Sequence, residues 1–349
     1  MVNSSKALSE YNLIEAAARG EFQTVKSQTE LGADVHASLS TDGETALHKA
    51  IRYGDPTIVA FILGNEVDPS MKTKEGYTAL HVVAAYAPEE TRVVIVDLLL
   101  GYNLVERFDK HGRTPLHCAT AQNNEDVISA LKSFGANLEI CTRDSGRSRA
   151  IHIAAENGHE VAMRRLVECG ADIHSKRAGG DTALHIAAKY GHMTALLSCL
   201  SLHLPVDSKY GATNTTALHI AATSGHEDVV VALLKENANR RMMTTDKATP
   251  LHLAAARGHA GVIYALLTGK PIPPPDNPGV SKEGVRGLVD RKLLEMRDGN
   301  KQTALHLAVK SGRPEAVITL LDLGSNHKAT MMMATHPCTW PVSTGTRPP

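Results

Sequence analysis

One four-residue phrase, Thr-Ala-Leu-His, recurs along this chain and constrains its fold more than any other feature. The phrase, or a close variant of it, begins at Thr45, Thr78, Thr114, Arg149, Thr182, Thr216, Thr249 and Thr303. The intervals between these positions are 33, 36, 35, 33, 34, 33 and 54 residues. A period this regular indicates an array of small stacked repeats rather than one globular domain. A weaker first repeat begins near Tyr11, which brings the number of repeats to nine.

Each phrase is expected to begin a helix. A Thr side chain can satisfy the unpaired N–H groups at a helix start, and Pro115 and Pro250 follow the Thr where their fixed φ suits the first helical residue. About nine residues after the Thr, a Gly such as Gly191 suits the left-handed conformation that ends a helix. A second apolar run, for example residues 229–234, predicts a second helix with one buried face.

A Gly two residues before most phrases, for example Gly76 or Gly112, marks a tight turn. This order of helix, turn, helix and extended turn strongly resembles the ankyrin repeat family, over roughly residues 11–326. The resemblance implies an all-α repeat solenoid of helix-turn-helix repeats with projecting β-hairpin loops. We expect a flexible N-terminus (residues 1–10), the solenoid (11–329) and a disordered C-terminal tail (330–349).

One Pro-rich insertion interrupts the array at residues 270–302. The prolines of residues 271–278 exclude a helix or a central strand there, so this part is expected to be extended. Residues 288–296 are amphipathic enough for a short helix or a lengthened hairpin arm. A loop this long in a regular array is either functional or tolerated drift, and the sequence favours neither.

Charge and composition limit the classes of partner that this chain can be expected to bind. The chain carries 37 basic and 37 acidic residues, so nothing argues for direct binding of nucleic acid or of an anionic membrane. Five cysteines without C-x-x-C spacing are read as reduced thiols. There is no signal-peptide pattern and no apolar run long enough to span a membrane. We therefore expect a monomer that binds a protein or peptide in the cytoplasm, with the nucleus as an alternative compartment.

The eighteen histidines do not predict a metal site, because twelve of them occupy repeat positions. Eight lie in the phrase, where the family resemblance implies hydrogen bonds to neighbouring turns, and four follow the helix-ending Gly. No Gly-rich phosphate loop, nucleophile elbow or paired carboxylates are found. We expect no metal, no cofactor and no catalytic residues, and thus no enzymatic activity.

Binding is expected at positions that the repeat leaves free to vary. Two sets qualify: the residue pair just before the helix-ending Gly, which would face a concave groove, and the tips of the hairpin loops. The predicted partner-binding residues are Arg52, Tyr53, Tyr77, Tyr86, Lys110, Arg113, Gln122, Glu156, Asn157, Lys189, Tyr190, Tyr210 and Arg257. Neither set should carry the packing, and five of the eight tyrosines fall in them, which favours a protein partner. The alternative is that these long side chains simply cover helix surfaces.

The predicted function is a non-catalytic scaffold or adaptor that binds a partner protein. One alternative is a nuclear transcription coregulator that acts through a protein partner. A more remote alternative is an enzyme that uses the insertion at residues 270–302.

Overall fold

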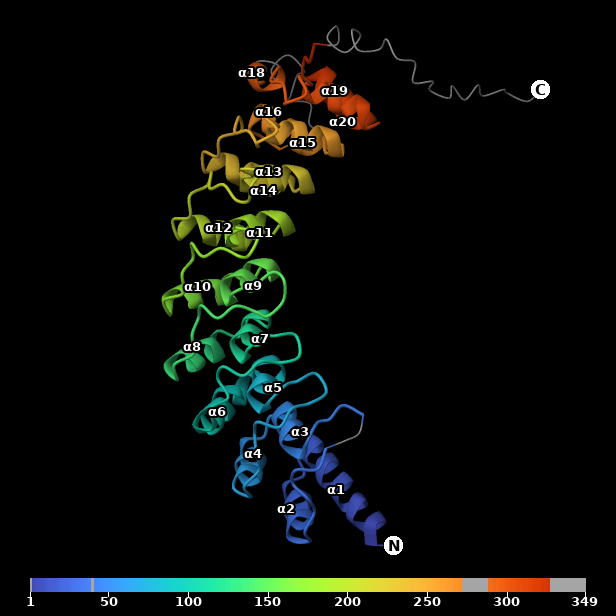
Figure 1. The fold of residues 1–349 in the computed structure, drawn as a ribbon, viewed down its shortest axis with the longest axis vertical. Coiled ribbons are helices and arrows are strands. Elements are labelled where there is room, and N and C mark those ends of the chain that lie inside the picture. The colour runs from blue at the N-terminus through green and yellow to red at the C-terminus, as the bar shows by residue number, and fades with distance from the viewer. Residues whose placement is uncertain (1, 39–40, 272–287, 327–349) are drawn as a thin grey trace, which may run out of the picture. The chain divides into compact units, whose positions relative to one another are not determined.

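The computed structural model describes residues 2–38, 41–271 and 288–326, and this part of the chain consists of helices joined by turns. The chain divides into two compact units, residues 1–211 and 212–349, called the N-terminal and C-terminal units below. Figure 1 shows that each unit is a row of paired helices. The all-α repeat architecture predicted from the sequence is confirmed.

The described part of the N-terminal unit contains six helix pairs. The first helices of these pairs are α1 (Val2–Arg19), α3 (Ala46–Tyr53), α5 (Ala79–Tyr86), α7 (Pro115–Ala121), α9 (Ala150–Asn157) and α11 (Ala183–Tyr190). The second helices are α2 (Phe22–Glu30), α4 (Pro56–Leu63), α6 (Glu89–Leu99), α8 (Glu125–Ser133), α10 (Glu160–Glu168) and α12 (Met193–Ser201). One turn of 3-10 helix, η1 (Leu100–Tyr102), follows α6. From α3 onward, each first helix begins directly after the first residue of the repeated phrase, as predicted.

The described part of the C-terminal unit contains three helix pairs. These are α13 (Ala217–Ser224) with α14 (Glu227–Lys235), α15 (Pro250–Arg257) with α16 (Ala260–Thr268), and α19 (Ala304–Lys310) with α20 (Pro314–Asp322). The short helix α18 (Arg291–Leu294) lies in the insertion, so the first of the two forms expected for residues 288–296 is observed. Most of the Pro-rich part, residues 272–287, and the predicted tail at 330–349 lie outside the described residues.

Small side chains let successive first helices approach one another closely. In the N-terminal unit, each first helix packs against the next one along the chain, from α1 to α11. Ala50, Ala84 and Ala119 lie in these contacts and have no exposed surface. Leu and Ile side chains of the same helices, such as Leu80, fill the space between the two helix layers. The core is therefore a continuous strip in which each repeat is stabilised by its neighbours.

In six of the repeated phrases, a buried histidine joins the helix start to the following loop. In α7, Nδ1 of His117 accepts a hydrogen bond from the Thr114 N–H (3.0 Å) and lies 2.8 Å from the Thr114 hydroxyl. Nε2 of His117 donates to the Ile140 carbonyl at 3.1 Å, which fixes the tautomer with Nδ1 as the acceptor. Corresponding bonds join His81 to Arg113, His152 to Ser175, His185 to Ser208 and, in the C-terminal unit, His252 to Gln302.

The N-terminal helix is longer than the sequence predicts. We expected helix only from about Glu10, but α1 begins at Val2 and so includes most of the segment predicted to be flexible. No Gly or Pro precedes Gly20, so nothing interrupts a helix that the buried residues Leu13 and Ile14 anchor on α2 and α3.

The loop before each first helix is a tight turn rather than a pair of β-strands. The N–H of Thr73 donates to the Tyr77 carbonyl (3.0 Å), and the N–H of Gly76 donates to the Thr73 carbonyl (2.8 Å). Across the described residues, β-pairing is limited to isolated bridges, one between Ser38 and Thr45 and others at Tyr210 and Thr215. The projecting loops are thus present, and no β-strand is assigned in them among the described residues.

Candidate partner-binding surface

Three of the predicted tyrosines lie at the last residue of a first helix in the N-terminal unit. Tyr53 ends α3, Tyr86 ends α5 and Tyr190 ends α11. Their exposed fractions are 51%, 44% and 41%, respectively. About half of each of these side chains is therefore exposed to solvent.

Each of these tyrosines is also held by the repeat that precedes it. The Tyr53 ring covers Gly20 so closely that a Cβ atom there would lie 2.1 Å from the ring. The guanidinium carbon of Arg52 lies 3.7 Å from the centroid of the Tyr86 ring. The Tyr190 hydroxyl donates to Glu156 Oε1 at 2.9 Å. All three rings are thus fixed in position although they are exposed.

An ion-pair network orients Arg52 beneath Tyr86. Arg52 Nε donates to Glu44 Oε1 at 2.7 Å, and Glu44 is itself buried. Lys49 Nζ lies 2.7 Å from Glu44 Oε2 and 2.9 Å from Asp42 Oδ2. Burial disfavours the charge on Lys49, but the hydrogen bonds to Glu44 and Asp42 outweigh it and raise the pKa of Lys49. Lys49 therefore stays charged beside Glu44, which holds the Arg52 guanidinium in place.

Tyr77 and Arg113 are packing residues, which corrects the expectation that neither predicted set carries packing. Tyr77 is only 9% exposed, and its ring stacks on His81 with 5.8 Å between ring centroids. Arg113 Nη2 donates to the Tyr77 hydroxyl at 2.8 Å, and Arg113 Nε donates to the fully buried Asp109 at 2.9 Å. Burial raises the pKa of Tyr77 to about 12. These contacts leave Tyr77 little surface for a partner.

A second cluster surrounds Tyr190. Glu156 accepts from the Tyr190 hydroxyl, and its backbone carbonyl accepts from His192 Nε2 at 2.9 Å. Lys189 Nζ lies 5.1 Å from the centroid of the Tyr190 ring. In the adjoining loop, Arg177 Nε donates to Asp181 Oδ2 at 3.0 Å. Burial of Asp181 favours its neutral form, but the contacts with Arg177 outweigh this and lower the pKa of Asp181.

The remaining predicted residues do not join either cluster. Tyr210 packs edge-on against His185, with 4.8 Å between ring centroids. Lys110 forms an ion pair with Glu75, and Asn157 Nδ2 donates to the Ile153 carbonyl at 2.9 Å. Gln122 is exposed at the end of α7. Arg257 is exposed at the end of α15 in the C-terminal unit.

The sequence prediction missed the residues that hold the clusters together. Asp109 forms an ion pair with the predicted residue Arg113. Lys49 forms an ion pair with Glu44, and Arg177 donates a hydrogen bond to Asp181 in the loop before α11. A usable signal existed for two of them, because Asp109 with Arg113 and Arg177 with Asp181 are opposite charges four residues apart across one turn. Lys49 is paired only through space, so no local pattern reveals it.

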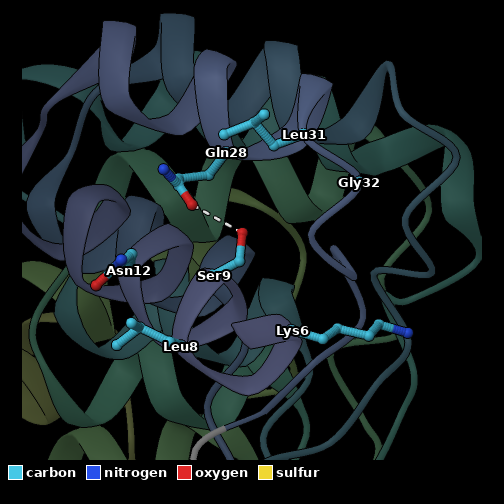
Figure 2. A pocket seen from close by; sticks show the side chains of 7 residues that line it. All are labelled: Lys6, Leu8, Ser9, Asn12, Gln28, Leu31 and Gly32. Carbon is cyan, nitrogen blue, oxygen red and sulfur yellow. Dashed lines mark hydrogen bonds between the residues drawn. The ribbon is translucent and has the colours of Figure 1, made fainter. Parts of the chain in front are cut away.

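A shallow hollow of 520 Å³ lies between α1 and α2, lined by Lys6, Leu8, Ser9, Asn12, Gln28, Leu31 and Gly32. Figure 2 shows the Ser9 hydroxyl directed at Gln28, to whose Oε1 it donates at 2.7 Å. Lys6 is the sole titratable residue among those lining it, so the hollow holds no acid–base pair.

In the part of the chain that the structure describes, no three His, Cys, Asp or Glu residues are grouped to hold a metal ion. No helix among those described has the length and apolar character needed to cross a membrane.

Comparison with known families agrees with the helix pairs. The family model described as "Ankyrin repeats (3 copies)" matches residues 13–94, 53–144, 135–204, 151–244, 195–274 and 239–331, which together cover most of the chain. The chain belongs to the ankyrin repeat family. Ankyrin repeats generally mediate protein–protein interactions, and stacked repeats present an extended surface suited to that role.

Other ankyrin repeat proteins resemble parts of this chain. It is 27% identical to mouse Rabankyrin-5 over 160 residues, which cover 46% of this chain and 13% of that protein. It is 30% identical to human transient receptor potential cation channel subfamily A member 1 over 150 residues, or 43% of this chain and 13% of the channel subunit. It is 25% identical to palmitoyltransferase AKR1 of Lachancea kluyveri over 166 residues, or 46% and 22%. The chain matches only a minor part of each relative, and their names differ widely, so membership of the family assigns no activity.

Proposed function

We propose that this ankyrin repeat chain is a non-catalytic scaffold that binds a protein or peptide partner. The binding surface comprises the ends of the first helices in the N-terminal unit, with Tyr53, Tyr86 and Tyr190 as its anchors. The observation that carries the proposal is that these three rings are exposed and yet held in place by Gly20, Arg52 and Glu156. An aromatic side chain that is already fixed loses little conformational freedom when a partner covers it.

Replacement of Tyr53, Tyr86 and Tyr190 together by Ala tests the proposal. Because these rings are about half exposed, thermal unfolding of the variant should stay close to that of the wild type. Capture of the partner should be lost, since exposed aromatic anchors contribute most of the affinity of many interfaces. The measurement is affinity purification of the intact chain from a cell extract, with quantitative mass spectrometry of the proteins that the variant fails to retain.

A matched control uses two other exposed tyrosines. Tyr11 in α1 and Tyr102 in η1 are 50% and 42% exposed and lie outside the predicted surface. The Tyr11→Ala, Tyr102→Ala variant should retain the wild-type set of captured proteins. If the triple variant retains the same set as this control, the three tyrosines are not the anchors and the surface is wrongly assigned.

The nuclear coregulator alternative would use the same surface and differs only in location. The two basic pairs at residues 164–165 and 240–241 are too short to be convincing import signals. Arg165 pairs with Glu125 at 3.0 Å and Arg241 with Asp290 at 2.7 Å, so these pairs already have acidic partners within the fold. We therefore favour a scaffold that does not depend on import, and imaging of a fluorescently tagged copy tests this choice.

A further inference from the structure

The loop tips of the N-terminal unit are joined to one another by backbone hydrogen bonds. The donors and acceptors are Lys74 N–H to Asp42 C=O (2.9 Å), Lys110 N–H to Glu75 C=O (3.1 Å) and Arg143 N–H to Gly112 C=O (3.1 Å). The tips therefore form one continuous row. Lys74, Lys110 and Arg143 occupy equivalent places in three consecutive loops, so their side chains recur along that row.

Basic side chains are in surplus along this row. In the turns at residues 73–77, 109–113, 142–148 and 177–181, the exposed basic residues are Lys74, Lys110, Arg143 and Arg147, called the tip row below. The exposed acidic residues of the same turns are Glu75 and Asp144. The other two carboxylates, Asp109 and Asp181, are paired with Arg113 and Arg177. The chain as a whole is balanced at 37 basic and 37 acidic residues, so the surplus is local.

The Arg143 guanidinium is held in a position in which its N–H groups can bind a carboxylate. Its guanidinium carbon lies 3.8 Å from the centroid of the Phe108 ring, in the loop that precedes it. No ion pair or side-chain hydrogen bond of Arg143 is found among the described residues. Arg stacked on an aromatic ring keeps its N–H donors for bidentate binding of a carboxylate or phosphate, and little freedom is lost when it binds.

Arg147 occupies a backbone conformation that favours glycine. Its φ is +48°, whereas the equivalent positions of neighbouring loops are Gly76 (+80°), Gly112 (+72°) and Gly180 (+86°). A side chain at such a φ carries a conformational cost that Gly would not. Strained residues of this kind are enriched at functional sites, so an Arg in place of a Gly at this tip indicates a use for its charge. In the C-terminal unit, Lys247 (+56°) and Lys301 (+61°) stand at the same loop position.

We propose that the tip row binds an acidic segment of the partner protein. The inference rests on the proposed function and adds the chemistry of the partner. A peptide can place separate Asp and Glu side chains opposite Lys74, Arg143 and Arg147. A nucleic acid backbone carries evenly spaced negative charge and would meet Glu75 and Asp144 as like charges. The tip row also adjoins the tyrosine surface, because Arg113 in the Lys110 loop bonds to Tyr77, whose ring centroid lies 6.1 Å from that of Tyr86.

The test compares two variants with equal loss of charge. The tip variant is Lys74→Gln, Arg143→Gln, Arg147→Gly, and it leaves Lys110 in its pair with Glu75. The control variant is Lys26→Gln, Lys132→Gln, Arg164→Gln, which removes three exposed cations from α2, α8 and α10. A random peptide library displayed on phage is selected on the wild-type chain. The recovered peptides should be enriched in Asp and Glu, and synthetic copies should bind the tip variant about tenfold more weakly than the control variant, with the difference reduced by salt.

Each other outcome has a defined meaning. Peptides without enrichment in Asp and Glu, or equal binding to both variants, would overturn the tip-row inference. If the triple Tyr variant fails to bind these peptides in that case, the proposed function would still be supported. A labelled thymidine oligonucleotide or a phosphatidylserine vesicle that binds more tightly than the selected peptides, and that is lost in the tip variant, would overturn the choice of an acidic protein.

Arg147→Gly alone supplies a second, independent readout. If the Arg is retained for binding, the Gly variant should melt no lower than the wild type, because Gly adopts this φ without strain. The same variant should bind the selected peptides more weakly. A lowered melting temperature would show instead that Arg147 stabilises the fold, which removes the strain argument for the proposal.

Discussion

Acidification should destabilise this chain through its buried repeat histidines. Burial lowers the pKa of His48, His81, His117 and His152 from 6.5 to about 4. The unfolded chain therefore takes up protons near pH 6.5, whereas the folded chain does so only near pH 4. The stabilisation is fully present above pH 6.5 and is lost as the pH falls toward 4. At about pH 5, each of these histidines reduces the free energy of unfolding by about 2 kcal/mol.

The substitution His117→Gln isolates one of these contributions. At about pH 7 the variant loses the contacts of Nδ1 with the Thr114 N–H and hydroxyl and of Nε2 with the Ile140 carbonyl. At about 1 kcal/mol for each bond, the free energy of unfolding falls by about 3 kcal/mol. At about pH 5 the wild type has itself lost about 2 kcal/mol through His117, but Gln does not titrate. The deficit of the variant should therefore shrink to about 1 kcal/mol.

Urea titrations followed by far-ultraviolet circular dichroism, at about pH 7 and about pH 5, measure both deficits. The control is His174→Gln, since His174 is exposed in a loop and its ring makes no hydrogen bond among the described residues. Carboxylates with lowered pKa, such as Asp181, act only below their ordinary value of 3.8 and do not enter this range. An equal deficit of His117→Gln at both pH values would refute the assignment of His117 as a buried, neutral donor and acceptor.

Three further substitutions test the loops by the same urea assay. Gly76→Ala should lower the free energy of unfolding by about 2 to 3 kcal/mol, because its φ is +80° and a Cβ would lie 2.5 Å from the Lys110 nitrogen. The control is Gly32→Ala, where φ is +84° but no heavy atom lies within 4 Å of an added Cβ, so the free energy of unfolding should fall by only about 1 kcal/mol. Equal losses in the two variants would show that the close approach of the next loop to Gly76 is unimportant. Asp109→Ala should cost about 2 to 3 kcal/mol, because it leaves the Arg113 guanidinium and the His111 N–H without their carboxylate; a loss under about 0.5 kcal/mol would contradict that role.

The helices could be predicted from the sequence because their limits depend on local chemistry. The N-cap position at Thr182 and the left-handed C-cap at Gly191 are properties of single residues, and both are found where the pattern places them. The start of α1 was missed because residues 2–10 contain no helix breaker, and several of them (Asn3, Ser4, Ser5 and Ser9) suit an N-cap, so the sequence marks no single boundary. The β-hairpin loops were expected from family resemblance alone, and the described loops contain tight turns and isolated bridges without assigned strands.

The exposure of the candidate site residues could be predicted less well, because it is decided by neighbouring repeats. Tyr77 and Tyr86 lie nine positions apart and were assigned the same role. Arg113 from the next repeat contributes to the burial of Tyr77, whereas Arg52 from the preceding repeat covers one face of Tyr86 and leaves 44% of it exposed. Both partners are more than thirty residues away in the chain, so no local pattern distinguishes the two tyrosines.

The positions that depart from the repeat carry the most information about a partner. At Gly112 a Cβ would lie 2.3 Å from the Cβ of Arg143, so the approach of the next loop makes Gly obligatory. At Arg147 the same loop position tolerates a side chain, and the chain places a cation there at a conformational cost. Packing explains the first choice but not the second. If Arg147 serves binding, its replacement by Gly should weaken binding without lowering the stability of the fold. If it serves no purpose outside the fold, the replacement should change neither binding nor stability. The single substitution Arg147→Gly therefore distinguishes a role of this side chain in binding from a role in stability.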